Sequence, residues 1–234
     1  MNASSMDMTS SGGARFWERL WRLSGLGFIL FFIVANVIYG AQPELGASAD
    51  ALAAFYNADR KQVLIAAVIN GMAVLNLLWF AAAIRATLAE AGRDGWGAAV
   101  TTAAALLGGM FLLLLTVNAA LAYSIAGSGD QALTSGLNDF AWALTVLTSF
   151  PRAMLIMAGT FGLWRAGLIS KALFAAGVAA LLLVLLGAVA WQSNGFWAPD
   201  GAYTRFVSPA IGFVWIVVVS WVLLNRTPAT GKAW

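Results

Sequence analysis

Arg152 is the residue whose type and position point most directly to chemistry. It lies at the middle of an apolar run over residues 141–164, with eleven residues of the run before it and twelve after it. An arginine at the centre of a membrane helix costs about 2.5–3.5 kcal/mol on insertion scales, so such residues usually face a bundle interior or a wet cavity. The position therefore predicts a guanidinium at half depth that could bind an anionic or amphiphilic ligand.

Polar residues close to Arg152 in the sequence share one face of the predicted helix. At helical spacing Thr145, Thr148 and Ser149 point in the same general direction as Arg152, and we expect this stripe to face inward. Other predicted helices supply asparagine side chains to the same interior. The candidate ligand-binding residues are Arg152, Ser149, Thr148, Thr145, Asn118, Asn76 and Asn70.

A structural role for Arg152 is the alternative interpretation. Pro151 lacks an N–H group, so it frees the carbonyl of Leu147 and favours a kink at this point of the helix. That carbonyl and the asparagine side chains could satisfy the guanidinium without any ligand. Lipid or anion binding by an Arg152→Gln variant would distinguish the two interpretations.

The composition excludes several classes of protein. Of the 234 residues, 61% are apolar and 10% are charged, against about 45–50% and 25% in soluble domains. A water-soluble globule, a disordered chain and a nucleic-acid binder are therefore excluded. The sequence has no cysteine and no histidine, which removes thiolate metal sites, histidine-ligated haem and Ser–His catalysis, so we expect neither a metal nor a cofactor.

Six apolar runs are each long enough to cross about 30 Å of hydrocarbon as a helix, and none contains an acidic residue. These runs are Leu23–Ala41, Val63–Ile84, Ala103–Ala126, Ala141–Trp164, Ala172–Trp191 and Phe206–Asn225. They predict an all-α protein, a polytopic transmembrane helical bundle. Within the fifth run, small residues including Ala172, Ala176 and Ala180 recur at four-residue spacing, which predicts close helix packing.

Basic residues are distributed unequally between the two predicted faces. One face carries Arg15, Arg19, Arg22, Arg85, Arg93, Arg165, Lys171, Arg226 and Lys232, and the other carries Arg60, Lys61 and Arg205. Because cytoplasmic loops are enriched in Lys and Arg, both termini are predicted to lie in the cytoplasm.

The chain divides into four predicted parts. Residues 1–14 are expected to be a disordered tail, and residues 15–22 an amphipathic helix on the membrane surface. Residues 23–225 form the six-helix transmembrane domain, and residues 226–234 form a cytoplasmic tail.

Two stretches of the chain are similar to a known family. The first runs from Phe55 to Arg85, with Asn57-Ala58-Asp59-Arg60 before the second run and Leu78-Trp79-Phe80-Ala81-Ala82-Ala83-Ile84-Arg85 at its end. The second is Trp164-Arg165-Ala166-Gly167-Leu168-Ile169. Over about residues 25–225 the chain resembles a family of uncharacterised bacterial multi-spanning membrane proteins of unknown function. The resemblance implies about six helices and no established activity, so it assigns no catalytic residue.

Three functions remain open at this stage. The first is a non-enzymatic protein of the bacterial cytoplasmic membrane that binds a lipid or amphiphile, or that serves as an accessory subunit, with Arg152 as the anchor. The second is a facilitator or transporter of an anionic or lipophilic solute. The third is a lipid-modifying enzyme, which would have to use loop carboxylates such as Asp59, Asp130 or Asp139 as its base. The expected partners are membrane lipids and either a second copy of the chain or a larger membrane complex.

Overall fold

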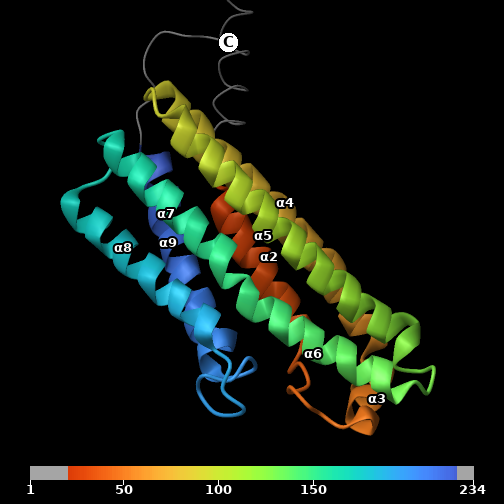
Figure 1. Ribbon diagram of the computed structural model, residues 1–234. Helices are drawn as coiled ribbons and strands as arrows, with labels where there is room; N and C mark the ends of the chain where they lie inside the picture. The colour runs from red at the N-terminus through yellow and green to blue at the C-terminus, as the bar shows by residue number, and fades with distance from the viewer. Residues whose placement is uncertain (1–20, 226–234) are drawn as a thin grey trace, which may run out of the picture.

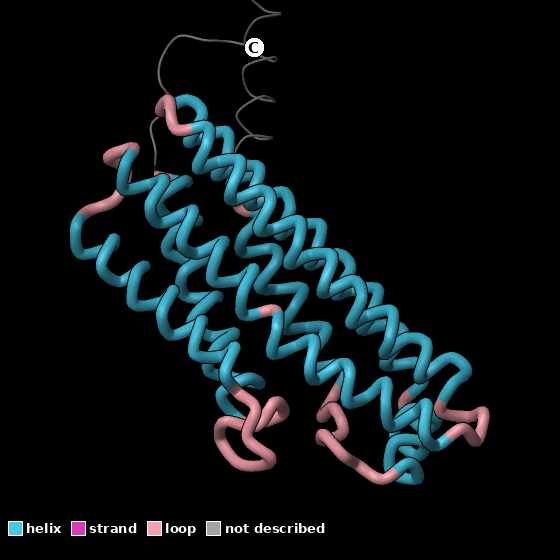
Figure 2. The backbone as a smooth tube through the Cα atoms, viewed as in Figure 1, coloured by secondary structure: helices cyan, strands magenta, loops and turns pink. Residues whose placement is uncertain are grey.

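The structure is a computed structural model that describes residues 21–225 (Figure 1). Every regular element in this part of the chain is a helix, which confirms the predicted all-α class (Figure 2). The predicted tails at 1–14 and 226–234 lie outside the described residues, as does most of the predicted surface helix at 15–22. The longer helices are α2 (Ser24–Tyr39), α3 (Ala49–Ala58), α4 (Arg60–Glu90), α5 (Asp94–Ala120), α6 (Gln131–Leu147), α7 (Ser149–Arg165), α8 (Lys171–Leu186) and α9 (Ser208–Leu224). The short ones are η1 (Leu121–Ile125), η2 (Gly187–Val189) and η3 (Tyr203–Val207).

Five helical segments are long and apolar enough to cross a membrane. They are Arg60–Glu90, Asp94–Ile125, Gln131–Arg165, Lys171–Val189 and Tyr203–Leu224. The first predicted span corresponds to α2, which is apolar but has 16 residues, or about 24 Å at the rise of a helix. It ends at Gly40, whose φ of 78° is a conformation that glycine adopts without strain. The chain is therefore a helical membrane protein with five candidate spans and a shorter apolar helix, where the sequence predicts six spans.

α2 and the five candidate spans alternate in direction, with α6 and α7 forming one span, so α2 begins and α9 ends at the same end of the bundle (Figure 1). We call this end the terminal end, and we call the other, where the loops before α3 and before η3 lie, the opposite end. The α4–α5 pair forms one side of the bundle, and α8 and α9 form the other side (Figure 1). α2 and α7 lie between these two sides.

A glycine allows α2 to approach α4 and α9 closely. A Cβ atom on Gly25 would come within 2.5 Å of Ser220 Oγ and 2.7 Å of the Phe80 ring. The three helices meet here, beside the main apolar core. Fully buried members of this core include Leu77, Phe80, Ile84, Leu88, Leu155 and Leu163. α2 is thus an integral part of the bundle even though it is short.

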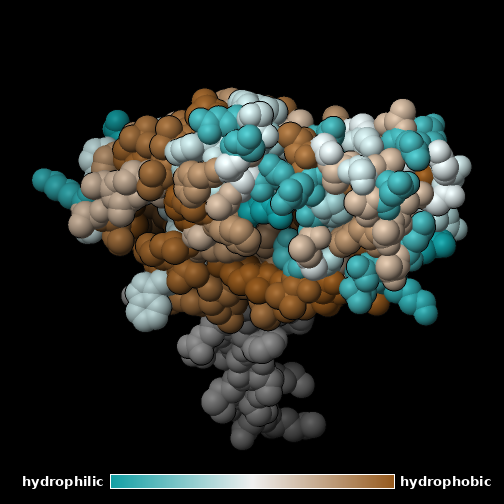
Figure 3. All heavy atoms as spheres, turned by 90° about the horizontal axis from the view of Figure 1, so that it is seen from below, coloured by the Kyte–Doolittle hydropathy of each residue, from teal (hydrophilic) through white to brown (hydrophobic). Residues whose placement is uncertain are grey.

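α3 lies at the opposite end and covers the ends of neighbouring helices. Ser48 caps it by accepting a hydrogen bond from the Ala51 N–H at 3.3 Å. Leu52 and Tyr56 are fully buried and pack with Leu121 in a second, smaller apolar cluster. Seen from this end, hydrophilic residues are interspersed across the face, and hydrophobic residues form a continuous band along one side (Figure 3).

Candidate functional site

Arg152 connects α7 to α9 by hydrogen bonds. Its Nη1 donates to Ser208 Oγ at 2.9 Å, and its Nη2 donates to Thr148 Oγ1 at 2.7 Å. Both hydroxyls are buried, and the Thr148 hydroxyl in turn donates to the carbonyl of Thr145 at 2.6 Å. No carboxylate within residues 21–225 forms a salt bridge with this guanidinium. Hydroxyl dipoles therefore hold the cation without neutralising it.

The helix breaks beside Arg152, where the sequence predicts a kink, but the groups that accept hydrogen bonds from Arg152 differ from the predicted one. α6 ends at Leu147, and α7 begins directly after Thr148, with Pro151 in its first turn. If Arg152 has only a structural role, the sequence predicts that the carbonyl of Leu147 accepts its hydrogen bond. In the structure two hydroxyls accept the hydrogen bonds of the guanidinium. Thr148 precedes Arg152 by four residues and shares its helix face, so its hydroxyl is the nearer partner.

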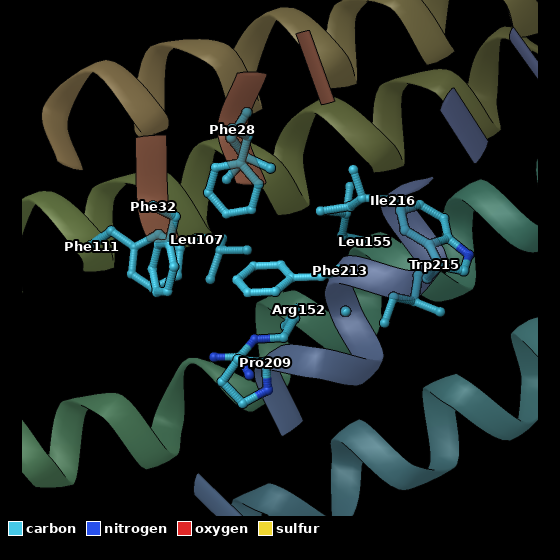
Figure 4. A pocket seen from close by; sticks show the side chains of 13 residues that line it. Phe28, Phe32, Leu107, Phe111, Arg152, Leu155, Pro209, Phe213, Trp215 and Ile216 are labelled. Carbon is cyan, nitrogen blue, oxygen red and sulfur yellow. The ribbon is translucent and has the colours of Figure 1, made fainter. Parts of the chain in front are cut away.

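Arg152 also lines a small cavity at the middle of the bundle (Figure 4). It reaches this cavity from α7, and aromatic side chains enter from α2, α5 and α9 (Figure 4). These aromatic residues are Phe28, Phe32, Phe111, Phe213 and Trp215. The cavity holds about 40 Å³, enough for a few water molecules at roughly 10–15 Å³ each. A phospholipid headgroup does not fit in this volume, and the binding of an anionic or amphiphilic ligand by Arg152 stays a prediction.

The other two polar residues of the predicted stripe are Thr145, which is half-buried, and Ser149, which is buried. Thr145 donates to the carbonyl of Ala141 at 2.8 Å within its own helix. Ser149 is buried, and a Cβ atom on Gly187 would come within 2.6 Å of its Oγ. Ser149 therefore lies in the contact between α7 and η2, and Thr145 bonds within α6.

The three predicted asparagines are dispersed and do not join Arg152. Asn118 accepts a hydrogen bond from the Tyr56 hydroxyl at 3.4 Å near the opposite end. Asn76 bonds a carbonyl of its own helix and packs against α2. Asn70 is half-buried on α4. Of the predicted residues, the structure therefore brings together Arg152, Thr148 and Thr145, with Ser149 beside them.

A groove that the sequence did not predict lies between α8 and α9, and its volume is about 710 Å³. We call it the α8–α9 groove. Residues from both helices that form its walls include Leu173, Ala176, Ala179, Ala210, Val214 and Val222. At its floor, Trp215 Nε1 donates a hydrogen bond to Thr160 Oγ1 of α7 at 2.9 Å. The surface is almost entirely apolar and lies on the flank of the bundle.

The small residues of α8 explain both the groove and why it was missed. The sequence pattern predicts close packing for all of them. Gly177 makes such a contact, with a Cβ position 2.5 Å from the Thr160 side chain, and Ala180 packs against the main apolar core, whereas Ala172 and Ala176 are exposed. Ala176 and Ala179 stay exposed and face small or β-branched residues of α9 across an open space. Small side chains on both walls are the signal that could have indicated a groove.

A second arginine lies among the loops of the opposite end. The Arg205 guanidinium is 4.7 Å from the centre of the Trp142 ring and 4.0 Å from Asp200 Oδ2. Asp200 also accepts a hydrogen bond from the Leu45 N–H at 2.9 Å, and Trp142 Nε1 donates to the carbonyl of Pro43 at 2.9 Å. These contacts fasten the loop between α2 and α3 to α6 and to the loop before η3.

Comparison with known proteins gives no family assignment. No family model matches the chain, and neither a curated protein nor a solved structure matches it. The two cavities and the distribution of charge are therefore the features that bear on function.

Proposed function

We propose that this protein is a non-enzymatic integral membrane protein that binds a lipid acyl chain in the α8–α9 groove. The observation that carries the proposal is the groove volume of about 710 Å³. This volume is many times the roughly 10–15 Å³ that one water-sized probe needs, so the groove has room for a polymethylene chain. On α8 it extends from Leu173 to Leu183, about 15 Å at the rise of a helix, which is half of a hydrocarbon core about 30 Å thick.

The groove lining supports binding and not catalysis. Its one hydroxyl side chain, Thr160, already accepts the Trp215 N–H bond. Two of the carboxylates that the enzyme alternative would use, Asp130 and Asp139, lie at the opposite end and have structural partners. Asp130 accepts the Leu133 N–H at 3.0 Å as the cap of α6, and Asp139 accepts the Gly46 N–H at 3.0 Å. No general base faces the proposed lipid.

The small cavity beside Arg152 does not support the transport alternative. A path for a charged solute needs polar lining groups, whereas the residues around this cavity other than Arg152 are apolar. Arg152 is not a lining residue of the α8–α9 groove, and Trp215 is the residue that borders both spaces. In this proposal Arg152 therefore stabilises the bundle and does not anchor the lipid.

The charge distribution supports a location in the bacterial cytoplasmic membrane with the terminal end in the cytoplasm. Among the described residues, the terminal end carries Arg22, Arg85, Glu90, Arg93, Asp94, Arg165 and Lys171. The opposite end carries Glu44, Asp50, Asp59, Arg60, Lys61, Asp130, Asp139, Asp200 and Arg205. Basic residues outnumber acidic ones at the terminal end, and acidic residues outnumber basic ones at the opposite end.

The proposal is tested by filling the groove. Ala176 and Ala210 are exposed groove residues on facing walls, so the double variant Ala176→Phe/Ala210→Phe occupies the space without crowding the core. Ala105→Phe, at an exposed position of α5 outside the groove, is the matched control. Native mass spectrometry of protein extracted with phospholipid should show a retained lipid in the wild type and the control, and its loss in the double variant. Equal lipid retention in all three proteins would overturn the proposal.

The same measurement distinguishes a lipid from a second protein in the groove. If the groove were the interface between two copies of the chain, the wild type would be a dimer and the double variant a monomer, with no change in lipid count. A lipid site predicts the same number of subunits in both.

A further inference from the structure

The guanidinium of Arg152 has hydrogen-bond donors that the protein does not use. A guanidinium carries five N–H groups, and two of those of Arg152 donate, one to Ser208 and one to Thr148. The other three N–H groups have no acceptor among residues 21–225. An N–H group without an acceptor costs free energy when it is away from water. The cavity that Arg152 lines is therefore the space in which a further acceptor would complete its bonding (Figure 4).

The positive charge of Arg152 is not neutralised by the described part of the chain. The salt bridges found there do not include Arg152, and the cation–π contacts are made by other arginines. Its two acceptors, Ser208 and Thr148, are neutral hydroxyls. A lone charge in a low-dielectric interior is costly, whereas two opposite charges side by side are much less so. A counter-charge in the cavity would therefore stabilise the bundle.

The size and lining of the cavity suit a small anion. Its volume of about 40 Å³ has room for a few water molecules, and a halide ion is only slightly larger than one of these. The lining side chains other than Arg152 carry no charge, so no carboxylate repels an anion there. Five of them are aromatic, and the edges of aromatic rings carry partial positive charge that an anion can contact. A single negative charge matches Arg152, whereas a second one would be left unpaired in apolar surroundings.

We infer that the cavity beside Arg152 binds one small monovalent anion of the halide class. The anion accepts hydrogen bonds from the unused N–H groups of the guanidinium and neutralises its charge. The inference goes beyond the proposed lipid-binding function, because it concerns a different space and a different ligand. The anion completes the junction between α7 and α9 that the bonds to Thr148 and Ser208 begin. We therefore expect the folded protein to be more stable when chloride is present.

A lipid headgroup is not the source of this negative charge. The cavity is too small for a headgroup, and Arg152 does not line the α8–α9 groove. The groove is also closed at the opposite end, where the Tyr203 hydroxyl donates a hydrogen bond to the carbonyl of Leu183 and joins η3 to α8. Just beyond, a Cβ atom on Gly187 would come within 3.3 Å of Ser208 Oγ, so η2 and the start of α9 are in contact. The anion therefore comes from the solution and not from a phospholipid in the groove.

The test is the melting temperature of the purified full chain in detergent, measured as chloride replaces gluconate at constant sodium concentration. Gluconate is too large for the cavity. A ligand that binds only the folded protein stabilises it in proportion to the logarithm of its concentration. Each tenfold increase in chloride above its dissociation constant should therefore raise the melting temperature by about 3–6 °C. Bromide, which has the same charge and a similar size, should act in the same way.

Variants separate a site in the cavity from a general effect of salt. Gly212 lines the cavity, and a Cβ atom there would meet only Arg152 Cδ, at 3.6 Å. Gly212→Val therefore fills the space while Arg152 stays, and it should abolish the response to chloride. Gly71→Val is the matched control, because a Cβ atom at this position of α4 meets open space, and it should keep the response. Arg152→Gln should abolish the response, and Arg152→Lys, which keeps the charge, should retain part of it.

Two results would overturn the inference. The first is a wild-type melting temperature that does not respond to chloride, which would leave water as the occupant of the cavity. The second is an equal response in wild type, Gly212→Val and Arg152→Gln, because the anion would then act elsewhere. Where Gly212→Val does not fold, equal responses of Arg152→Gln and Arg152→Lys overturn the inference. Lipid retention in the α8–α9 groove is measured separately by mass spectrometry, so neither result changes the standing of acyl-chain binding.

Discussion

Arg152 of α7 and Ser208 of α9, 56 residues apart in the chain, are joined by a hydrogen bond of 2.9 Å at the middle of the bundle. The bond lies next to the contact of η2 with Ser149, so it fixes the position of α9 against the α6–α7 junction. Hydrogen bonds to charged groups contribute about 1.5–3 kcal/mol when they are buried, although bonds between membrane helices average less.

Replacing Ser208 with alanine should therefore destabilise the protein. The substitution removes the acceptor of Arg152 Nη1, and we expect a loss of about 1–2 kcal/mol in the free energy of unfolding, measured by denaturation in detergent. Ser193→Ala, at an exposed loop position, is the matched control and should change stability by less than about 0.5 kcal/mol. Equal stability of the two variants would show that the bond contributes nothing.

Arg152→Gln separates the two roles considered for this residue. Since Arg152 is outside the α8–α9 groove, the variant should melt at a lower temperature but retain the same amount of phospholipid as the wild type. Lipid retention measured by native mass spectrometry at a temperature where both proteins are folded gives the comparison. Loss of lipid without a lower melting temperature would restore the anchor hypothesis.

Two helical glycines should respond to alanine in opposite ways. Gly25→Ala places a methyl group within 2.5–2.9 Å of side chains on α4 and α9, and it should destabilise the protein by about 1–3 kcal/mol. Gly71→Ala on α4 meets open space, so the higher helix propensity of alanine should leave the stability unchanged or raise it by up to about 1 kcal/mol. Thermal unfolding of the two variants checks both signs, and a stable Gly25→Ala protein would show that α2 is not packed as described.

Tyr56 should make the stability depend on pH in the alkaline range. Burial raises the pKa of this phenol above its ordinary value of 10, and the hydrogen bond with Tyr39 opposes the shift only in part. A folded-state pKa above the unfolded value means that the contribution is complete below pH 10 and is lost as the pH rises through the folded-state value. The free energy of unfolding should therefore decrease above pH 10 in the wild type, and less steeply in Tyr56→Phe. Tyr123→Phe, on an exposed side chain, should keep the steeper decrease.

Hydropathy predicted most of the fold because it is a local property of the chain. The apolar runs mark the cores of α4, α5, α7, α8 and α9 directly. The length of α2 was overestimated because the run of apolar residues continues to Ala41, while the backbone turns at Gly40. The length of the helix around Arg152 was underestimated, because α6 extends the helical segment back to Gln131. This added part contains polar residues, so hydropathy alone does not include it.

The candidate site was predicted less well because it depends on contacts between distant segments. Helical spacing correctly placed Thr148 beside Arg152, but no local pattern connects Arg152 to Ser208. Asparagines from other helices were expected to face the same interior as Arg152, whereas Asn118 bonds Tyr56 and Asn76 packs against α2. The groove depends on the divergence of α8 from α9, which is a property of three-dimensional packing and has no signature in either helix alone.

The hydrogen bond between the Tyr203 hydroxyl and the Leu183 carbonyl limits how far a lipid could move between α8 and α9. An acyl chain bound between α8 and α9 is blocked at this bond. Its polar headgroup therefore has no continuous path along these two helices to the other side of the bilayer. Exchange with the surrounding membrane is confined to one monolayer. Under the proposed function, this geometry suits the storage or presentation of a lipid and not its transfer between the two sides.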